Sequence, residues 1–170
     1  MHTITVITCI FSLLSLSACS SLKMQSNHLY EELVVSLRKP GEKLVSLPDE
    51  VWQEHNCDDK AQPYLQIETF EVIPKIIQPG ESFNLRLLYS LCTSDRHEEI
   101  IGNLYTRISF RGNYLINDRE RNYAMKPGRW LTDTFIDLPS AAKLGVYSIQ
   151  LKFNSPRLQL KEQASFVVDH

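Results

Sequence analysis

Apolar and polar residues alternate along most of the chain from Tyr64 onward, in runs that glycine and proline interrupt. Between residues 83 and 91, for example, every odd position is apolar. A period of two is typical of strands that bury one face and expose the other. We expect seven strands, at residues 65–73, 83–91, 103–111, 114–123, 130–138, 146–154 and 164–168. Short strands with such punctuation and no helical period predict an all-β fold, an antiparallel β-sandwich.

Two motifs around these strands resemble those of bacterial immunoglobulin-like domains. Residues 79–83 (PGESF) precede a long alternating strand, as at the opening of the second strand in many of those domains. Residues 138–139 (LP), followed by residues 145–149 (GVYSI), are similar to their corner between strands E and F. The resemblance covers residues 63–169 and implies an immunoglobulin-like sandwich in which the Tyr147 hydroxyl bonds back to the backbone. Ile149 stands where antibody domains have their second cysteine, so their intersheet disulfide is not expected.

The first 18 residues form an apolar stretch that ends in the small residues Ser17 and Ala18. It is shorter than the ~20 apolar residues that span a bilayer, and it has the length of a signal-peptide core. Residues 16–19 (LSAC) resemble the lipobox of bacterial lipoproteins, which implies cleavage before Cys19 and transfer of a diacylglyceryl group, with palmitate among its acyl chains, to the Cys19 thiol. Ser20 in place of aspartate implies sorting to the outer membrane, facing the periplasm or the surface. The alternative is an ordinary signal peptide cut near Ala18, with Cys19 left as a plain thiol.

Residues 19–62 differ from the strands that follow, and we expect a lipid-anchored tether with a short helical extension. A helix is expected over residues 28–38, where leucine recurs every fourth position before Pro40-Gly41. A second short helix is expected to start at Pro48, with acidic residues in its first turn and Val51 and Trp52 as its apolar contacts. The predicted organisation is therefore a signal peptide (1–18), this extension (19–62) and the sandwich (63–169).

Cys57 and Cys92 are the cysteines that remain when Cys9 leaves with the leader and Cys19 carries lipid. A single pair in an oxidising compartment predicts a disulfide. His55 and His97 lie close in sequence to this pair, which leaves a metal-handling protein as an alternative, with all four residues as Zn or Cu ligands. Their spacing matches no known metal motif, so neither a metal nor another cofactor is predicted.

A basic and aromatic cluster between residues 105 and 130 is the strongest candidate for a binding surface. Its proposed binding residues are Arg107, Arg111, Arg119, Arg121, Arg129 and Tyr114. Arginine with aromatic residues is typical of contact surfaces, and the partners expected are an acidic protein or an anionic glycan. The alternative is a solvated outer sheet with local arginine–carboxylate pairs, each of which contributes little to stability. The net charge of −2 gives no indication of nucleic-acid binding.

Sequence motifs for catalysis are absent. The chain has no nucleophile elbow, no phosphate-binding glycine loop and no His-Glu-x-x-His. The acidic pairs Asp58-Asp59 and Glu98-Glu99 are adjacent in sequence, unlike the converging carboxyls of a glycosidase. We therefore expect no enzyme, but a lipid-anchored binding or scaffolding module of the cell envelope. An enzyme whose site has no recognisable motif is the second alternative.

Overall fold

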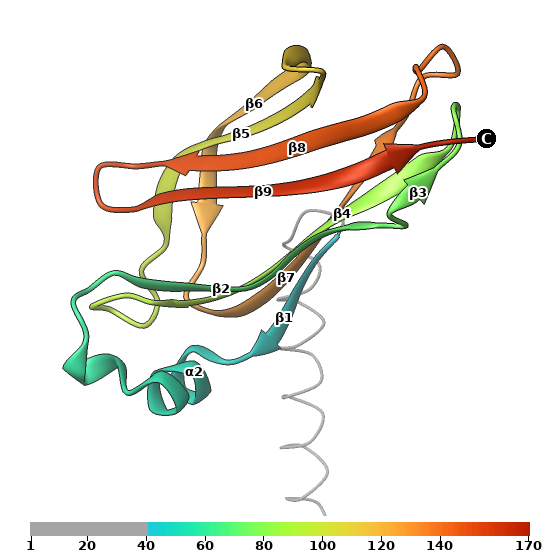
Figure 1. Cartoon of the computed structure of the whole chain (residues 1–170). Helices are drawn as coiled ribbons and strands as arrows, with labels where there is room; N and C mark the ends of the chain where they lie inside the picture. Colours follow the sequence, from blue (N-terminus) through green and yellow to red (C-terminus); the bar gives the residue numbers. More distant parts are fainter. Residues whose placement is uncertain (1–40) are drawn as a thin grey trace, which may run out of the picture. The chain divides into compact units, whose positions relative to one another are not determined.

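Two β-sheets face each other in the computed structural model, which describes residues 41–170 (Figure 1). The first sheet has the order β1 (Glu42–Ser46), β7 (Gly128–Asp137), β4 (Ser82–Cys92) and β2 (Tyr64–Ile73). The second has the order β3 (Ile76–Ile77), β9 (Gln159–Val168), β8 (Gly145–Asn154), β5 (Ile100–Phe110) and β6 (Asn113–Met125). All neighbours are antiparallel except β3 and β9, which pair in parallel. The predicted all-β, immunoglobulin-like sandwich is confirmed.

The strand order explains this assignment. Strands β2, β4 and β7 correspond to A, B and E of an immunoglobulin-like domain, and β9, β8 and β5 to G, F and C. Tyr147 Oη donates a hydrogen bond to the Lys143 carbonyl oxygen at 2.9 Å, which confirms the tyrosine corner. Ile149 is fully buried between the sheets, at the position where antibody domains place a cysteine.

The core consists of the inward positions of both sheets. The odd-numbered residues of β4, from Phe83 to Leu91, are buried and meet the inward residues of β8, such as Leu151 and Phe153. The alternation read from the sequence therefore gives the correct inner face for these strands.

Two strands are additional to the seven expected ones. Strand β1 pairs with β7, so residues 42–46 belong to the first sheet and to the same compact unit as the sandwich. Strand β3 has two residues, too few for a recognisable alternation. Strand β9 begins at Gln159, five residues before the predicted start. The expected helix at residues 28–38 and the lipobox with Cys19 lie outside the described residues.

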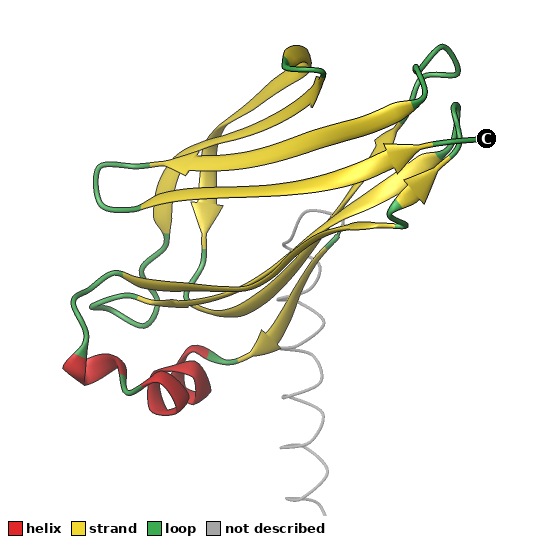
Figure 2. Cartoon of the chain, in the orientation of Figure 1, coloured by secondary structure: helices red, strands yellow, loops and turns green. Residues whose placement is uncertain are grey.

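Helix α2 (Pro48–His55) confirms the predicted second helix, and the short 3₁₀ helix η1 (Cys57–Asp59) follows it (Figure 2). Proline stands at the first helical position, and the Glu50 carboxylate accepts a hydrogen bond from the Leu47 amide at 2.9 Å. Val51 is fully buried against Cys57 and Cys92. Helix α2 thus packs on strands β4 and β7, over one end of the first sheet.

Candidate binding surface

The outer face of the second sheet gathers most of the predicted cationic residues. In β5, Ile108 points into the core, so the odd-numbered residues point outward. Residues paired across strands share a side of the sheet, which defines three rows over β6, β5, β8 and β9. These rows are Arg121–Asn103–Asn154–Gln159, Arg119–Tyr105–Lys152–Lys161 and Asn117–Arg107–Gln150–Gln163. We call these twelve positions the basic face; its four strands lie side by side in Figure 1.

The charge of the basic face has one sign. Five of its twelve positions are cationic and none is acidic: Arg107, Arg119, Arg121, Lys152 and Lys161. The acidic residues of the same strands, Asp118, Glu120 and Glu162, occupy the alternate positions and so belong to the other side of the sheet. The strand period therefore separates the two signs, although they alternate in the sequence.

Neutral groups hold the arginines of the basic face. Arg107 Nε donates to Asn117 Oδ1 at 2.9 Å, and Arg119 Nη2 donates to Asn103 Oδ1 at 3.0 Å. Both guanidinium groups lie beside the Tyr105 ring, at 5.8 Å and 5.4 Å from its centroid. Amide and ring contacts fix the direction of a guanidinium without cancelling its charge, so these side chains are oriented and still fully cationic.

Two lysines of the basic face oppose each other. Lys152 on β8 and Lys161 on β9 are direct cross-strand partners on the outer side of the sheet. Like charges in this arrangement destabilise a sheet by a few tenths of a kcal/mol, up to about 1 kcal/mol. An anion bound between them would remove this repulsion.

Two further predicted residues lie at the tip of the β5–β6 hairpin. Arg111 occupies the turn with a φ of 51°, and its guanidinium is 5.0 Å from the Phe110 ring. The Tyr114 side chain is 64% exposed, and the Arg107 guanidinium lies 5.5 Å from its ring. The tip therefore continues the basic face, with Tyr114 as an exposed aromatic residue.

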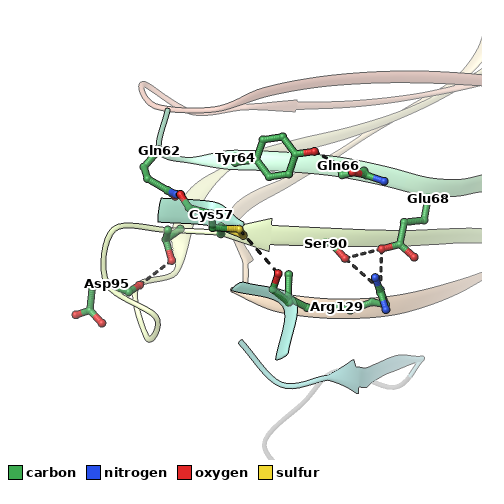
Figure 3. The surroundings of a disulfide bond; sticks show 11 residues. Cys57, Gln62, Tyr64, Gln66, Glu68, Ser90, Asp95 and Arg129 are labelled. Atoms are coloured by element: carbon green, nitrogen blue, oxygen red, sulfur yellow. Dashed lines mark hydrogen bonds and ion pairs between the residues drawn. A yellow bond between two sulfur atoms is a disulfide. The ribbon is translucent and has the colours of Figure 1, made fainter. Parts of the chain in front are cut away.

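Arg129, in contrast, does not join this surface, because β7 belongs to the first sheet. Its Nε donates to Glu68 Oε1 at 2.7 Å and to Ser90 Oγ at 3.1 Å, as Figure 3 shows. Its Nη2 donates to Glu54 Oε1 at 2.6 Å. These hydrogen bonds raise the pKa of Arg129, and the same Arg129 contact lowers the pKa of Glu54. Arg129 is a structural residue that links helix α2 to the first sheet.

The predicted disulfide between Cys57 and Cys92 is confirmed, with 6.3 Å between the Cα atoms. It joins η1 to the end of β4. Because both sulfur atoms are in the disulfide, neither cysteine is available as a thiolate ligand for the alternative metal site. The His55 ring contacts Tyr64, with 5.9 Å between the ring centroids. Within residues 41–170, no three His, Cys, Asp or Glu side chains form a group suited to a metal ion.

An apolar cavity of about 400 Å³ lies at the end of the sandwich near the β5–β6 turn. Its walls come from both sheets and include Phe83, Ile108, Phe110, Leu115 and Leu138. No sequence pattern predicts this cavity, because its residues are distributed over distant strands.

Lys152, Lys161 and the amides of the basic face were also missed. Their signal was present: the outward positions of residues 150–154 and 159–163 are all amide or lysine. Only the order of the strands brings them beside Arg107 and Arg119.

Comparisons with known proteins show distant likeness to parts of other structures. No protein-family model and no curated protein matches the chain. Pseudomonas fluorescens alkylpurine DNA glycosylase AlkC bound to abasic-site DNA matches at 13% identity and a TM-score of 0.44, over 62% of this chain and 30% of that one. Bacillus subtilis sporulation control protein Spo0M matches at 10% identity and a TM-score of 0.45, over 62% of this chain and 49% of that one.

The CARDB domain of the Pyrococcus furiosus PF1109 protein, in complex with di-metal ions, matches at 15% identity and a TM-score of 0.39, over 62% of this chain and 86% of that domain. This chain thus spans less than half of AlkC and about half of Spo0M. Likeness at this level carries no inference about function.

Proposed function

We propose that this protein is a lipid-anchored protein of the cell envelope that binds an anionic partner through its basic face. Cys19 is the anchor, and the sandwich is the binding module. The observation that carries the proposal is an outer sheet face with five cations and no carboxylate among its twelve positions. Such a surface attracts anions over several ångströms and binds them with charge-assisted hydrogen bonds.

The alternative of a solvated sheet with local ion pairs is less well supported for this face. Such pairs occur in the first sheet, where Arg86 and Arg129 have carboxylate partners. On the basic face the corresponding partners of Arg107 and Arg119 are amides. A face without internal compensation leaves its charge available for a ligand.

Binding without turnover is the activity that we infer. The described carboxyl groups with shifted pKa values, Glu54 and Asp133, owe the shift to a neighbouring arginine in an ion pair. Perturbed groups of this kind serve stability, whereas catalytic groups are expected to converge in a cleft.

The binding test uses the mature lipidated chain in detergent and three immobilised polyanions: polygalacturonate, phosphorylated dextran and polyglutamate. The Arg119→Glu/Arg121→Glu variant should lose at least about tenfold in affinity for the polyanions that the wild type binds. The control, Lys43→Glu/Lys143→Glu, makes the same charge change at exposed positions outside the basic face and should change affinity less than about twofold. Equal losses in both variants, or no binding of any polyanion, would overturn the proposal.

The anchor is tested separately by labelling with palmitate in cells. The wild type should incorporate the label and sediment with membranes, because two or more acyl chains anchor a protein stably. Cys19→Ala should remain unlabelled and move to the soluble fraction. Membrane sedimentation of the unlabelled variant would reject the anchor and leave the binding proposal intact.

A further inference from the structure

We infer that the anionic partner is a polysaccharide that carries carboxylate or phosphate groups, bound along the basic face. This inference rests on the proposed function and adds the class of ligand. It is drawn from the seven positions of the basic face that are not cationic.

Six of these seven positions are side-chain amides, and the seventh is Tyr105. The amides are Asn103, Asn117, Gln150, Asn154, Gln159 and Gln163. An amide offers both a hydrogen-bond acceptor and two donors on one planar group. Sugar hydroxyls are also donors and acceptors at once, so a surface of amides matches a sugar chain in any local orientation.

A protein partner fits this surface less well. Protein interfaces have an apolar centre that becomes fully buried, surrounded by a polar rim. The three rows of the basic face contain no aliphatic side chain, and Tyr105 at their centre lies beside the guanidinium groups of Arg107 and Arg119. Desolvating such a surface against a protein is costly, whereas a hydrated sugar chain keeps much of its water.

The dimensions of the basic face suit a segment of a chain. Three rows spaced by two residues cover about 14 Å along the strands, and four strands cover about 14 Å across them. Cations flank Tyr105 on both sides of the middle row, with Arg119 on β6 and Lys152 and Lys161 on β8 and β9. Repeated acidic groups along a polymer can therefore contact forked guanidinium donors at one edge and ammonium groups at the other.

The test compares four immobilised probes against the mature lipidated chain in detergent. Polygalacturonate has charge and sugar, its methyl ester has sugar without charge, polyglutamate has charge without sugar, and phosphorylated dextran replaces carboxylate by phosphate. We expect one of the two charged glycans to bind at least about tenfold more tightly than polyglutamate and than the methyl ester. The tighter of the two charged glycans identifies the acidic group.

A paired substitution separates sugar recognition from charge. Gln150→Leu/Gln163→Leu removes two outward amides without changing the charge and should weaken glycan binding at least about fivefold, with polyglutamate binding unchanged. Gln78→Ala, at an exposed position outside the basic face, is the control.

The results distinguish the two proposals. Equal affinity for the charged glycans and polyglutamate, with no effect of the glutamine pair, would overturn the polysaccharide and favour an acidic protein, while the proposed function stands. Failure of all charged probes would overturn both.

Discussion

The outer face of the first sheet carries two arginines, Arg86 and Arg129, and each is paired with a carboxylate. Arg86 Nε and Nη2 donate to the two carboxylate oxygens of Asp133, at 2.9 Å and 3.2 Å, and Arg129 binds both Glu68 and Glu54. We call this surface the paired face. On the basic face of the second sheet, Arg107 and Arg119 have amide partners instead.

The two faces show that the cross-strand neighbour decides the role of an arginine. On the paired face the guanidinium groups stabilise the fold, and helix α2 covers one end of that face. On the basic face the same group is oriented but uncompensated, which costs a little stability and leaves it free for a ligand.

The largest effect on stability is expected from the Cys57–Cys92 disulfide, against which helix α2 packs on the paired face. Cys57→Ser/Cys92→Ser should lower the free energy of unfolding by about 4 kcal/mol, because the bond closes a loop with a sequence separation of 35. Urea unfolding measures this loss. At low temperature, where the variant remains folded, its affinity for polygalacturonate should equal that of the wild type. A folded variant with lost affinity would mean that the two faces are coupled.

The next largest effect is expected from removing the carboxylate that balances the charge of Arg129 on the paired face. Glu68→Gln removes a carboxylate that accepts from Arg129 Nε and Ser90 Oγ, and it should cost about 2 kcal/mol. Glu99→Gln, at an exposed loop position before β5, is the control and should change stability by less than about 0.5 kcal/mol. Urea midpoints of the wild type and the two variants measure these changes. Equal midpoints would show that the Glu68 contact contributes nothing to stability.

Local patterns predicted the features that depend on few residues. The inward positions of β4, the corner at Tyr147 and the start of α2 at Pro48 follow from alternation, a turn motif and helix-end preferences. The disulfide followed from cysteine count and compartment.

Features that depend on strand neighbours were not predictable in this way. Arg129 follows the β5–β6 hairpin closely in sequence, but the chain crosses to the other sheet between Met125 and Gly128, where β7 begins. Lys152 and Lys161 lie far from Arg119 in sequence and join it only because β8 and β9 continue the same sheet. Strand β1 was missed because five residues give little alternation.

A substitution of Lys152 is expected to have a smaller effect on stability and to change stability and affinity in opposite directions. Lys152→Glu replaces the repulsion from Lys161 with attraction and should raise the free energy of unfolding by about 0.5 kcal/mol. The same change should lower polygalacturonate affinity about tenfold, since it places a carboxylate in the middle row of the basic face. Lys43→Glu serves as the control for charge alone. A loss of both stability and affinity would indicate a structural role for Lys152 and contradict the uncompensated basic face.

The last effect is the pH dependence of stability that the paired face should show. The Arg86 hydrogen bonds hold the pKa of Asp133 below its ordinary value, with Asn84 adding to the effect. As pH falls, the unfolded chain takes up the proton first, so the stabilisation is complete above the ordinary carboxyl range and is lost as pH falls through the folded pKa. Asp133→Asn should therefore be about 1 kcal/mol less stable than the wild type near pH 6, and this difference should shrink as the pH falls below about 4. Urea midpoints across this range measure it. Polygalacturonate affinity at pH 6 should be unchanged in Asp133→Asn, because Asp133 belongs to the outer face of the first sheet and not to the basic face.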